Sequence, residues 1–146
     1  MARLFTAIKA RKQKCIVALS PNPFNFALPA SLQDWFTWER RGYIEEIVLQ
    51  VYRSDIKRFN LELDREEVKL AKVHIPTAIG ILTGLRNNPV PLKQIQDQVQ
   101  EVRKRDFGGV SFFFYESLSS WAQETPEQRN AAFRAFFPTK IQRPAV

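Results

Sequence analysis

Glu46-Ile-Val-Leu-Gln-Val-Tyr52 is an almost unbroken apolar run, and three further runs of this kind occur along the chain. They are Cys15–Ser20, Thr77–Leu82 and Val110–Tyr115. Short apolar runs without strict alternation are typical of parallel strands that are covered on both faces. Successive runs are about 30 residues apart, the usual length of a strand plus a crossover helix. The sequence therefore predicts an α/β fold with four consecutive βα units.

The segments between these runs carry helix start and stop signals. In Asp64-Arg-Glu-Glu67, Asp64 is placed to accept hydrogen bonds from first-turn amides, as in a capping box. Gly42 and Pro138 each follow an amphipathic segment and act as stop signals. The expected helices are Ala2–Arg11, Ala30–Arg41, Asp64 to about His74, Pro91 to the residues before Gly108, and Thr125 to Pro138.

The number of units suggests part of a closed barrel. A whole (β/α)8 barrel takes about 250 residues, so four units in 146 residues occupy close to half of one. The segment Ala2–Arg11 resembles the end of a helix that follows an earlier strand. We therefore predict one partial domain over residues 1–146, the C-terminal half of a TIM (β/α)8 barrel, with residues 139–146 as a flexible tail. A small open sheet is the alternative.

The charge is basic but dispersed. The chain has 22 lysine and arginine residues against 15 aspartate and glutamate residues, which leaves a net charge of +7. Several cations stand at expected helix ends, for example Arg40, Arg41 and residues 103–105, where they complement the helix dipole. No recognition motif accompanies them, so nucleic acid is the least favoured partner.

Several other classes of protein lack their signals here. Cys15 has no second cysteine with which to form an internal disulfide or a thiolate metal site, and is expected to be a buried structural thiol. His74 also stands alone, so no metal site is expected. Pro21-Asn22-Pro23 follows the first run where a phosphate-binding loop would need glycines; it most simply shapes a turn, and no cofactor is expected. No membrane span or signal peptide is visible, and the default compartment is the cytoplasm.

Each expected strand becomes polar at its carboxyl end, the edge at which parallel α/β sheets bind ligands. Amide, phenol, guanidinium and carboxylate groups collect at this rim. Such groups suit a polyhydroxylated substrate, because a sugar offers many hydroxyl groups as well as apolar ring faces. The rim residues that we select as candidates are Asn22, Gln50, Tyr52, Arg53, Arg86, Tyr115 and Glu116.

These candidates also have structural explanations. Glu116 could pair with Arg53 or Arg86 across the strand ends, and the sequence favours this pairing and a catalytic role about equally. Gln50 and Tyr52 could be satisfied within the rim by their neighbours. The rim therefore points to a binding site more strongly than to any one reaction.

Five motifs in order along the chain resemble the bacterial glycosyl-hydrolase-like 10 domain, in the form common in cyanobacterial proteins. They are Ser20–Pro23, Leu32–Trp35, Gln50–Arg53, Gly80–Leu85 and Gly109–Glu116, and the resemblance runs from about Thr6 to Arg143. It implies a (β/α)8 barrel that hydrolyses glycosidic bonds in a polysaccharide or cell-wall glycan. It also implies that Gln50, Tyr52, Arg53 and Glu116 line the substrate cleft, with Asn22 and Asp34 nearby.

The chain departs from this pattern by starting at what would be the fifth strand. Glycoside hydrolysis usually needs two carboxyl groups, about 5 Å apart for retention or about 6.5 to 9.5 Å apart for inversion. Only Glu116 directly follows a strand, whereas Asp34 and Asp55 lie farther along their loops or helices. We expect an O-glycosyl hydrolase homologue that is inactive without an N-terminal half; a non-catalytic carbohydrate-binding or assembly module is the alternative. Exposed strand edges also predict self-association or a separate N-terminal half as partner.

Overall fold

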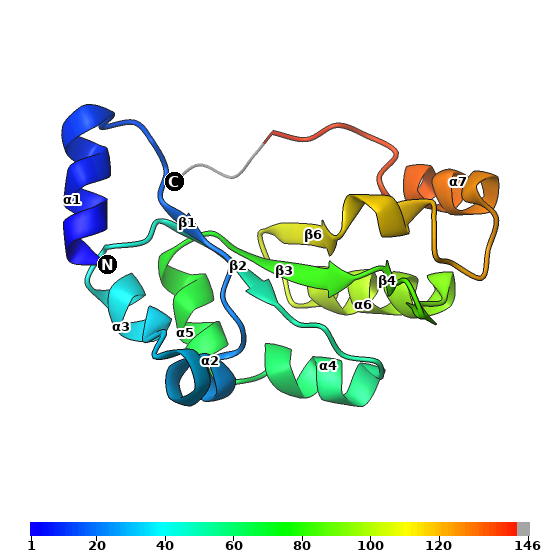
Figure 1. The fold of residues 1–146 in the computed structure, drawn as a ribbon, viewed down its shortest axis with the longest axis horizontal. Coiled ribbons are helices and arrows are strands. Elements are labelled where there is room, and N and C mark those ends of the chain that lie inside the picture. Colours follow the sequence, from blue (N-terminus) through cyan, green and yellow to red (C-terminus); the bar gives the residue numbers. More distant parts are fainter. Residues whose placement is uncertain (143–146) are drawn as a thin grey trace.

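The computed structural model describes residues 1–142, and its centre is a sheet of four parallel strands (Figure 1). The strands lie side by side in the order in which they occur along the chain. They are β1 (Ala18–Leu19), β2 (Glu46–Gln50), β3 (Thr77–Leu82) and β6 (Gly109–Phe113). Their order and direction confirm the predicted α/β fold with a parallel sheet. The last four residues of the predicted tail, 143–146, lie outside the described part of the chain.

The first strand is shorter than predicted. Of the run Cys15–Ser20 only Ala18–Leu19 pairs with β2. At the start of the run, the amide of Val17 donates to the Glu45 side chain (Oε2, 2.8 Å). At the other end Pro21 follows almost at once, and a proline cannot donate a hydrogen bond to a strand ladder. Ser20 continues the link to β2 with its side chain, because its Oγ donates to the carbonyl oxygen of Val48 (2.9 Å).

Helices connect the strands and flank the sheet. They are α1 (Ala2–Arg11), α2 (Phe24–Ser31), α3 (Trp35–Arg40), α4 (Ile56–Leu63), α5 (Glu66–His74), α6 (Leu92–Lys104), the 3-10 turn η1 (Tyr115–Leu118) and α7 (Pro126–Phe136). A two-stranded hairpin, β4 (Gly84–Leu85) and β5 (Asn88–Pro89), lies between β3 and α6. The predictions for α1, for the end of α5 and for the starts of α6 and α7 are confirmed. Thr125 and Gln128 cap α7 reciprocally, so this start signal works as a capping box.

The single helix predicted over Ala30–Arg41 is wrong. The chain forms α2 and α3 instead, with Leu32 between them in the left-handed conformation (φ 53°). Asp34 starts the second helix, because its Oδ1 accepts a hydrogen bond from the amide of Thr37 (3.1 Å). A cap of this kind satisfies a first-turn amide and sets the helix start, whatever the spacing of the apolar residues on either side.

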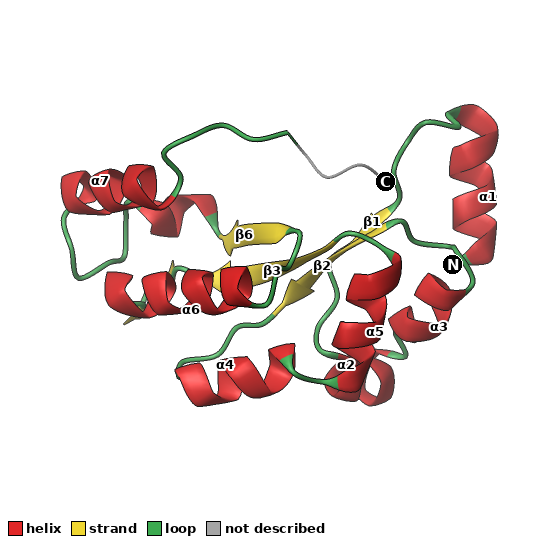
Figure 2. Ribbon diagram, turned by 180° about the vertical axis from the view of Figure 1, so that it is seen from behind, coloured by secondary structure: helices red, strands yellow, loops and turns green. Residues whose placement is uncertain are grey.

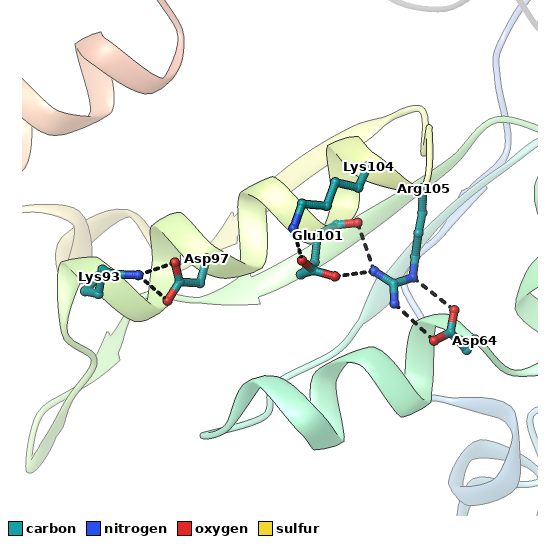
Figure 3. A network of polar contacts seen from close by, with 6 residues as sticks. All are labelled: Asp64, Lys93, Asp97, Glu101, Lys104 and Arg105. Carbon is teal, nitrogen blue, oxygen red and sulfur yellow. Dashed lines mark hydrogen bonds and ion pairs between the residues drawn. The ribbon is translucent and has the colours of Figure 1, made fainter.

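The capping box predicted at Asp64 is also wrong, because α4 was not foreseen and Asp64 stands at its end. Its carboxylate accepts two hydrogen bonds from the guanidinium of Arg105 (2.9 and 3.0 Å), far away at the end of α6 (Figure 3). Arg105 also donates to Glu101 (2.6 Å). Asp64 therefore joins two neighbouring helices rather than starting α5.

The core lies between the sheet and the helices on one of its sides. Ile47, Leu49, Ile79 and Ile81 are fully buried and belong to one apolar cluster with the helices. Figures 1 and 2 show α3, α4, α5 and α6 along the same side of the strands. None of the helices within residues 1–142 combines the length and apolar character needed to cross a bilayer.

The opposite sheet face is less covered. Between the buried residues of β2 and β3 stand side chains that are only partly buried, such as Val48, Gln50 and Ala78. A shallow cavity of about 260 Å³ lies here toward the amino ends of the strands, lined in part by Glu46, Val48, Ala78 and Ser111. We call this side of β2, β3 and β6 the open face.

Candidate functional site

Two aromatic rings meet on the open face at the carboxyl ends of the strands. Tyr52, just after β2, stacks on Phe113 at the end of β6, with ring centroids 5.4 Å apart and planes 24° apart. Gly80 of β3 lies next to the Tyr52 ring, because a Cβ at this residue would be 3.6 Å from a Tyr52 ring carbon, an ordinary contact distance. The same Cβ would be 3.2 Å from the carbonyl oxygen of Leu49, so the tighter restriction at Gly80 comes from the backbone of β2.

The stack continues into a longer series of rings. Phe113 contacts Phe114 (centroids 5.1 Å apart), and Phe114 contacts Trp121 (5.4 Å). We call Tyr52, Phe113, Phe114 and Trp121 the aromatic row. Phe113 is 46% exposed and Trp121 38%, so part of the row faces solvent. Tyr115, next to it in the chain, is 85% exposed.

A cavity of about 180 Å³ opens beside the aromatic row. Tyr52 and Arg53 contribute its wall from the end of β2, and Asn88 and Gln94 contribute from the hairpin and from α6. It is smaller than the cavity near the amino ends of the strands. However, it holds the phenol, guanidinium and amide groups that the other cavity lacks, and it lies at the edge where parallel sheets bind ligands.

Arg53 is held in this cavity by a nearly buried carboxylate. Its Nη2 donates to Glu62 Oε1 on α4 (3.0 Å), and Glu62 also pairs with Arg65. Burial acts to raise the pKa of Glu62, but the hydrogen bonds from Arg65 and Arg53 outweigh it and hold that pKa below its usual value. The carboxylate therefore stays ionised and keeps the guanidinium in place.

The backbone at this point is fixed as well. The carbonyl oxygen of Arg53 accepts hydrogen bonds from the side-chain amides of Gln94 (3.2 Å) and Gln98 (2.9 Å) on α6. Tyr52 keeps its phenolic proton at neutral pH, since the usual tyrosine pKa of about 10 is already well above 7 and burial raises the pKa of Tyr52 further. The cavity thus presents a neutral hydroxyl group next to a permanent cation.

Glu116 lies in η1 and is exposed. Within residues 1–142 its carboxylate makes neither an ion pair nor a hydrogen bond, so the expected alternatives of pairing with Arg53 or Arg86 are not realised. Arg86 stands in the turn of the β4–β5 hairpin and is exposed too. These two charged groups are available to a ligand or to a partner chain.

The other predicted site residues make mainly structural contacts. Gln50 Nε2 donates to the carbonyl oxygen of Ser20 (2.7 Å) and thereby joins the ends of β1 and β2. The carbonyl oxygen of Asn22 accepts from the indole of the buried Trp35 (3.1 Å). Asp34, the cap of α3, lines a separate cavity that none of the other candidates reaches. The fold therefore brings Tyr52 and Arg53 together and leaves Asn22 and Asp34 apart from them.

Sequence reasoning missed two parts of this region. One is the aromatic row, for which the run Phe112–Tyr115 was the available signal. The other is a buried polar group beneath η1, centred on Arg129, for which no local pattern exists. In the described chain, no cluster of three or more histidine, cysteine, aspartate and glutamate side chains is arranged to hold a metal ion. Cys15 is half-buried rather than fully buried as expected.

Comparison with known proteins gives one result. The family model described as Glycosyl hydrolase-like 10 matches residues 1–101. The matched part contains the candidates from Asn22 to Arg86, whereas Tyr115 and Glu116 lie beyond it. No curated protein and no solved structure matches the chain.

Proposed function

The chain belongs to the glycosyl hydrolase-like 10 family, and from this premise we propose that the aromatic row and the cavity beside it bind a polysaccharide or cell-wall glycan. The observation that carries the proposal is the stack of Tyr52 on the partly exposed Phe113, next to Arg53, at the carboxyl edge of a parallel sheet. Aromatic faces with a few fixed polar groups are what a ligand with apolar faces and many hydroxyl groups requires. Gln50, Tyr52, Arg53, Arg86 and Tyr115 would contact the glycan, with Asn22 and Asp34 at the periphery.

Glu116 is the candidate acid. Hydrolysis of a glycosidic bond normally needs a second carboxyl group on the other side of the bond. Asp34 and Asp55 accept hydrogen bonds from the first-turn amides of their helices, and Glu62 is paired with two arginines. None of these three is disposed to serve as the second acid. We propose that the chain binds glycan alone and hydrolyses it only when a partner supplies the missing carboxylate.

The open face supports the further proposal that the four βα units are half of a (β/α)8 barrel. Parallel sheets occur almost only with both faces covered, whereas here the helices cover one face. The outer edges of β1 and β6 also have no neighbouring strand within residues 1–142. Four further strands, from a second copy or from a separate N-terminal half, would cover the face and pair both edges.

Phe113→Ala tests the glycan site. Affinity for a panel of soluble polysaccharides and cell-wall glycan fragments, measured by calorimetry, should fall about fivefold or more, since stacking and burial against one aromatic ring are worth roughly 1 to 3 kcal/mol. Phe26→Ala is the matched control, because Phe26 is similarly exposed (54%) but lies on α2, away from the row. Equal affinities of the wild type and both variants would refute the site.

Glu116→Gln separates binding from hydrolysis. If Glu116 is the acid, this variant should keep its glycan affinity, and its turnover in the partnered assembly should fall by far more than tenfold. The second candidate function is a non-catalytic binding module, which is favoured by the lack of a second unpaired carboxylate among Asp34, Asp55 and Glu62. If the chain is such a module, the wild type should bind glycan but release no reducing ends, whichever partner chain is added. Unchanged turnover in Glu116→Gln would remove Glu116 from the chemistry.

A further inference from the structure

A buried guanidinium lies beneath the turn that presents Tyr115 and Glu116. The Arg129 side chain is fully buried (0% exposed), although it comes from the first turn of α7. A guanidinium has five N–H donors, and Arg129 makes five hydrogen bonds. Their acceptors are Leu118 O (3.0 Å), Val90 O (3.2 Å), Glu124 Oε2 (3.0 Å), Thr83 O (2.9 Å) and Ser117 O (3.1 Å). No donor remains for a ligand, so Arg129 is not itself a binding residue.

The acceptors belong to segments that are otherwise far apart in the chain. Thr83 follows β3, Val90 precedes α6, and Ser117 and Leu118 are in η1. Glu124 supplies the counter-charge and also accepts from the amide of Leu92 at the start of α6 (2.7 Å). Arg129 therefore joins the end of the central strand to η1 and to the beginnings of α6 and α7.

Hydroxyl groups reinforce the same junction. Thr83 Oγ1 and Ser117 Oγ, both in buried residues, are hydrogen-bonded at 2.7 Å. Ser117 Oγ also accepts from the amide of Phe114 (3.1 Å). Gly84 permits close approach here, because a Cβ at this residue would lie 3.1 Å from the carbonyl oxygen of Trp121. The underside of η1 is thus densely bonded, while its upper side carries the exposed Tyr115 and Glu116.

We infer that Arg129 is a positioning residue: it fixes η1 against the end of β3 and thereby sets where Tyr115 and Glu116 stand beside the aromatic row. The role of these two residues rests on the proposed function, but the fixing of the turn does not. Lysine cannot replace arginine here, because an ammonium group has three donors on one atom and cannot reach five acceptors spread around a planar fork. Four of those acceptors are backbone carbonyl groups, so the fork holds the main chain of the turn directly.

Arg129→Lys tests the fixing of the turn by amide hydrogen exchange. The amides of Ser117 and Ser120 bond within the turn, to Phe114 O and Glu116 O. Their exchange should become at least about tenfold faster, whereas amides of β2 and β3 should change little, because the opening is local. Arg134→Lys, the same change at an exposed position on the same helix, is the matched control and should have no effect.

A uniform acceleration over the whole chain, or none in the turn, would overturn the inference. Arg129→Gln carries no buried charge and is the second variant if Arg129→Lys does not fold. Failure of both variants to fold while Arg134→Lys folds would also overturn it, since Arg129 would then support the entire domain rather than the turn.

A double-mutant cycle tests the link to the site. If Arg129 acts through Tyr115, then Arg129→Lys and Tyr115→Ala each weaken glycan binding, and the double variant binds no worse than Tyr115→Ala alone. Additive losses would show that Arg129 does not act through Tyr115. If the wild type binds no glycan, the proposed function is refuted. The hydrogen-exchange experiment would still decide whether Arg129 fixes the turn.

Discussion

Glu62 shows at the residue scale how one buried carboxylate can organise a site. It pairs with Arg53 at the cavity and with Arg65 at the start of α5, and its own pKa is depressed by these two partners despite burial. Removing it would leave two guanidiniums without their common acceptor. Because both arginines remain partly exposed, water would take up part of the lost interaction.

Glu62→Gln is therefore expected to lower the free energy of unfolding near pH 7 by about 1 to 2 kcal/mol, within the range for hydrogen bonds to charged groups. The folded-state pKa of Glu62 is lower than the unfolded-state value, which is about 4.3. The stabilisation is thus present above that pH and is lost as the pH falls through the folded pKa. In urea unfolding at a series of pH values, the difference in unfolding free energy between wild type and Glu62→Gln should become smaller below about pH 4.

Glu66→Gln is the control for this series, since Glu66 lies exposed on the neighbouring helix α5. Its unfolding free energy should follow that of the wild type. If the unfolding free energies of wild type and Glu62→Gln differ by the same amount down to about pH 3, the ion pairs of Glu62 are not the source of the stabilisation.

At the scale of elements, α6 carries two kinds of ion pair that Figure 3 places side by side. Lys93 and Asp97 are one turn apart on the solvent-facing surface of α6, and the lysine side chain is 76% exposed. Arg105, only 24% exposed, connects Glu101 of α6 with Asp64 at the end of α4. The first pair lies within one helix, whereas the second fixes one helix against another.

Arg105→Gln should therefore lower the free energy of unfolding more than Lys93→Gln. For Arg105 we expect about 1 to 2 kcal/mol, because two charge-assisted contacts are lost and one of them is bidentate. For Lys93 we expect about 0.5 kcal/mol or less, the usual contribution of an exposed pair within a helix. Thermal or urea unfolding at low ionic strength measures both, and equal losses would show that the contact between α4 and α6 does not depend on Arg105.

At the scale of the whole molecule, the open face differs from the usual parallel sheet, which is covered on both faces. The helices bury one side of β2 and β3, while Val48 and Ala78 on the other side line a shallow cavity. Within residues 1–142, the outer edges of β1 and β6, on either side of that face, have no neighbouring strand. Exposed edges and an uncovered sheet face both favour association with another chain.

We accordingly predict that the purified chain is a dimer or larger species in light scattering at micromolar concentration. Val48→Lys, which places a charge on the open face, should shift the distribution toward monomer. Val73→Lys is the matched control, because Val73 is 80% exposed on α5, on the helix side of the sheet. A wild type that remains a soluble monomer at all concentrations would argue against the half-barrel, and equal effects of the two variants would place the interface elsewhere.

The sequence alone predicted the four strands of the parallel sheet, their direction and the ends of the helices that it foresaw, but not the β4–β5 hairpin, the helix α4 or the break between α2 and α3. The predicted features depend on signals that neighbouring residues carry together: apolar runs about 30 residues apart, Thr125 before Pro126, and the family motifs in matching order. Between Leu32 and Asp34, the spacing of the apolar residues predicted one continuous helix and did not reveal the break. The helix cap at Asp34 decided the boundary there.

The tertiary structure alone decided which groups meet. Arg53 pairs with Glu62 rather than Glu116, Asp64 accepts from Arg105 rather than from its own helix, and Arg129 reaches Thr83, 46 residues away. The reason is physical: a charged or polar side chain bonds to whichever partner the folded chain brings within about 3 Å. The residues next to that side chain in the sequence do not indicate which partner this will be. Helix and strand periodicity can be read from neighbours, whereas the partners of a buried arginine depend on the packing of the whole domain.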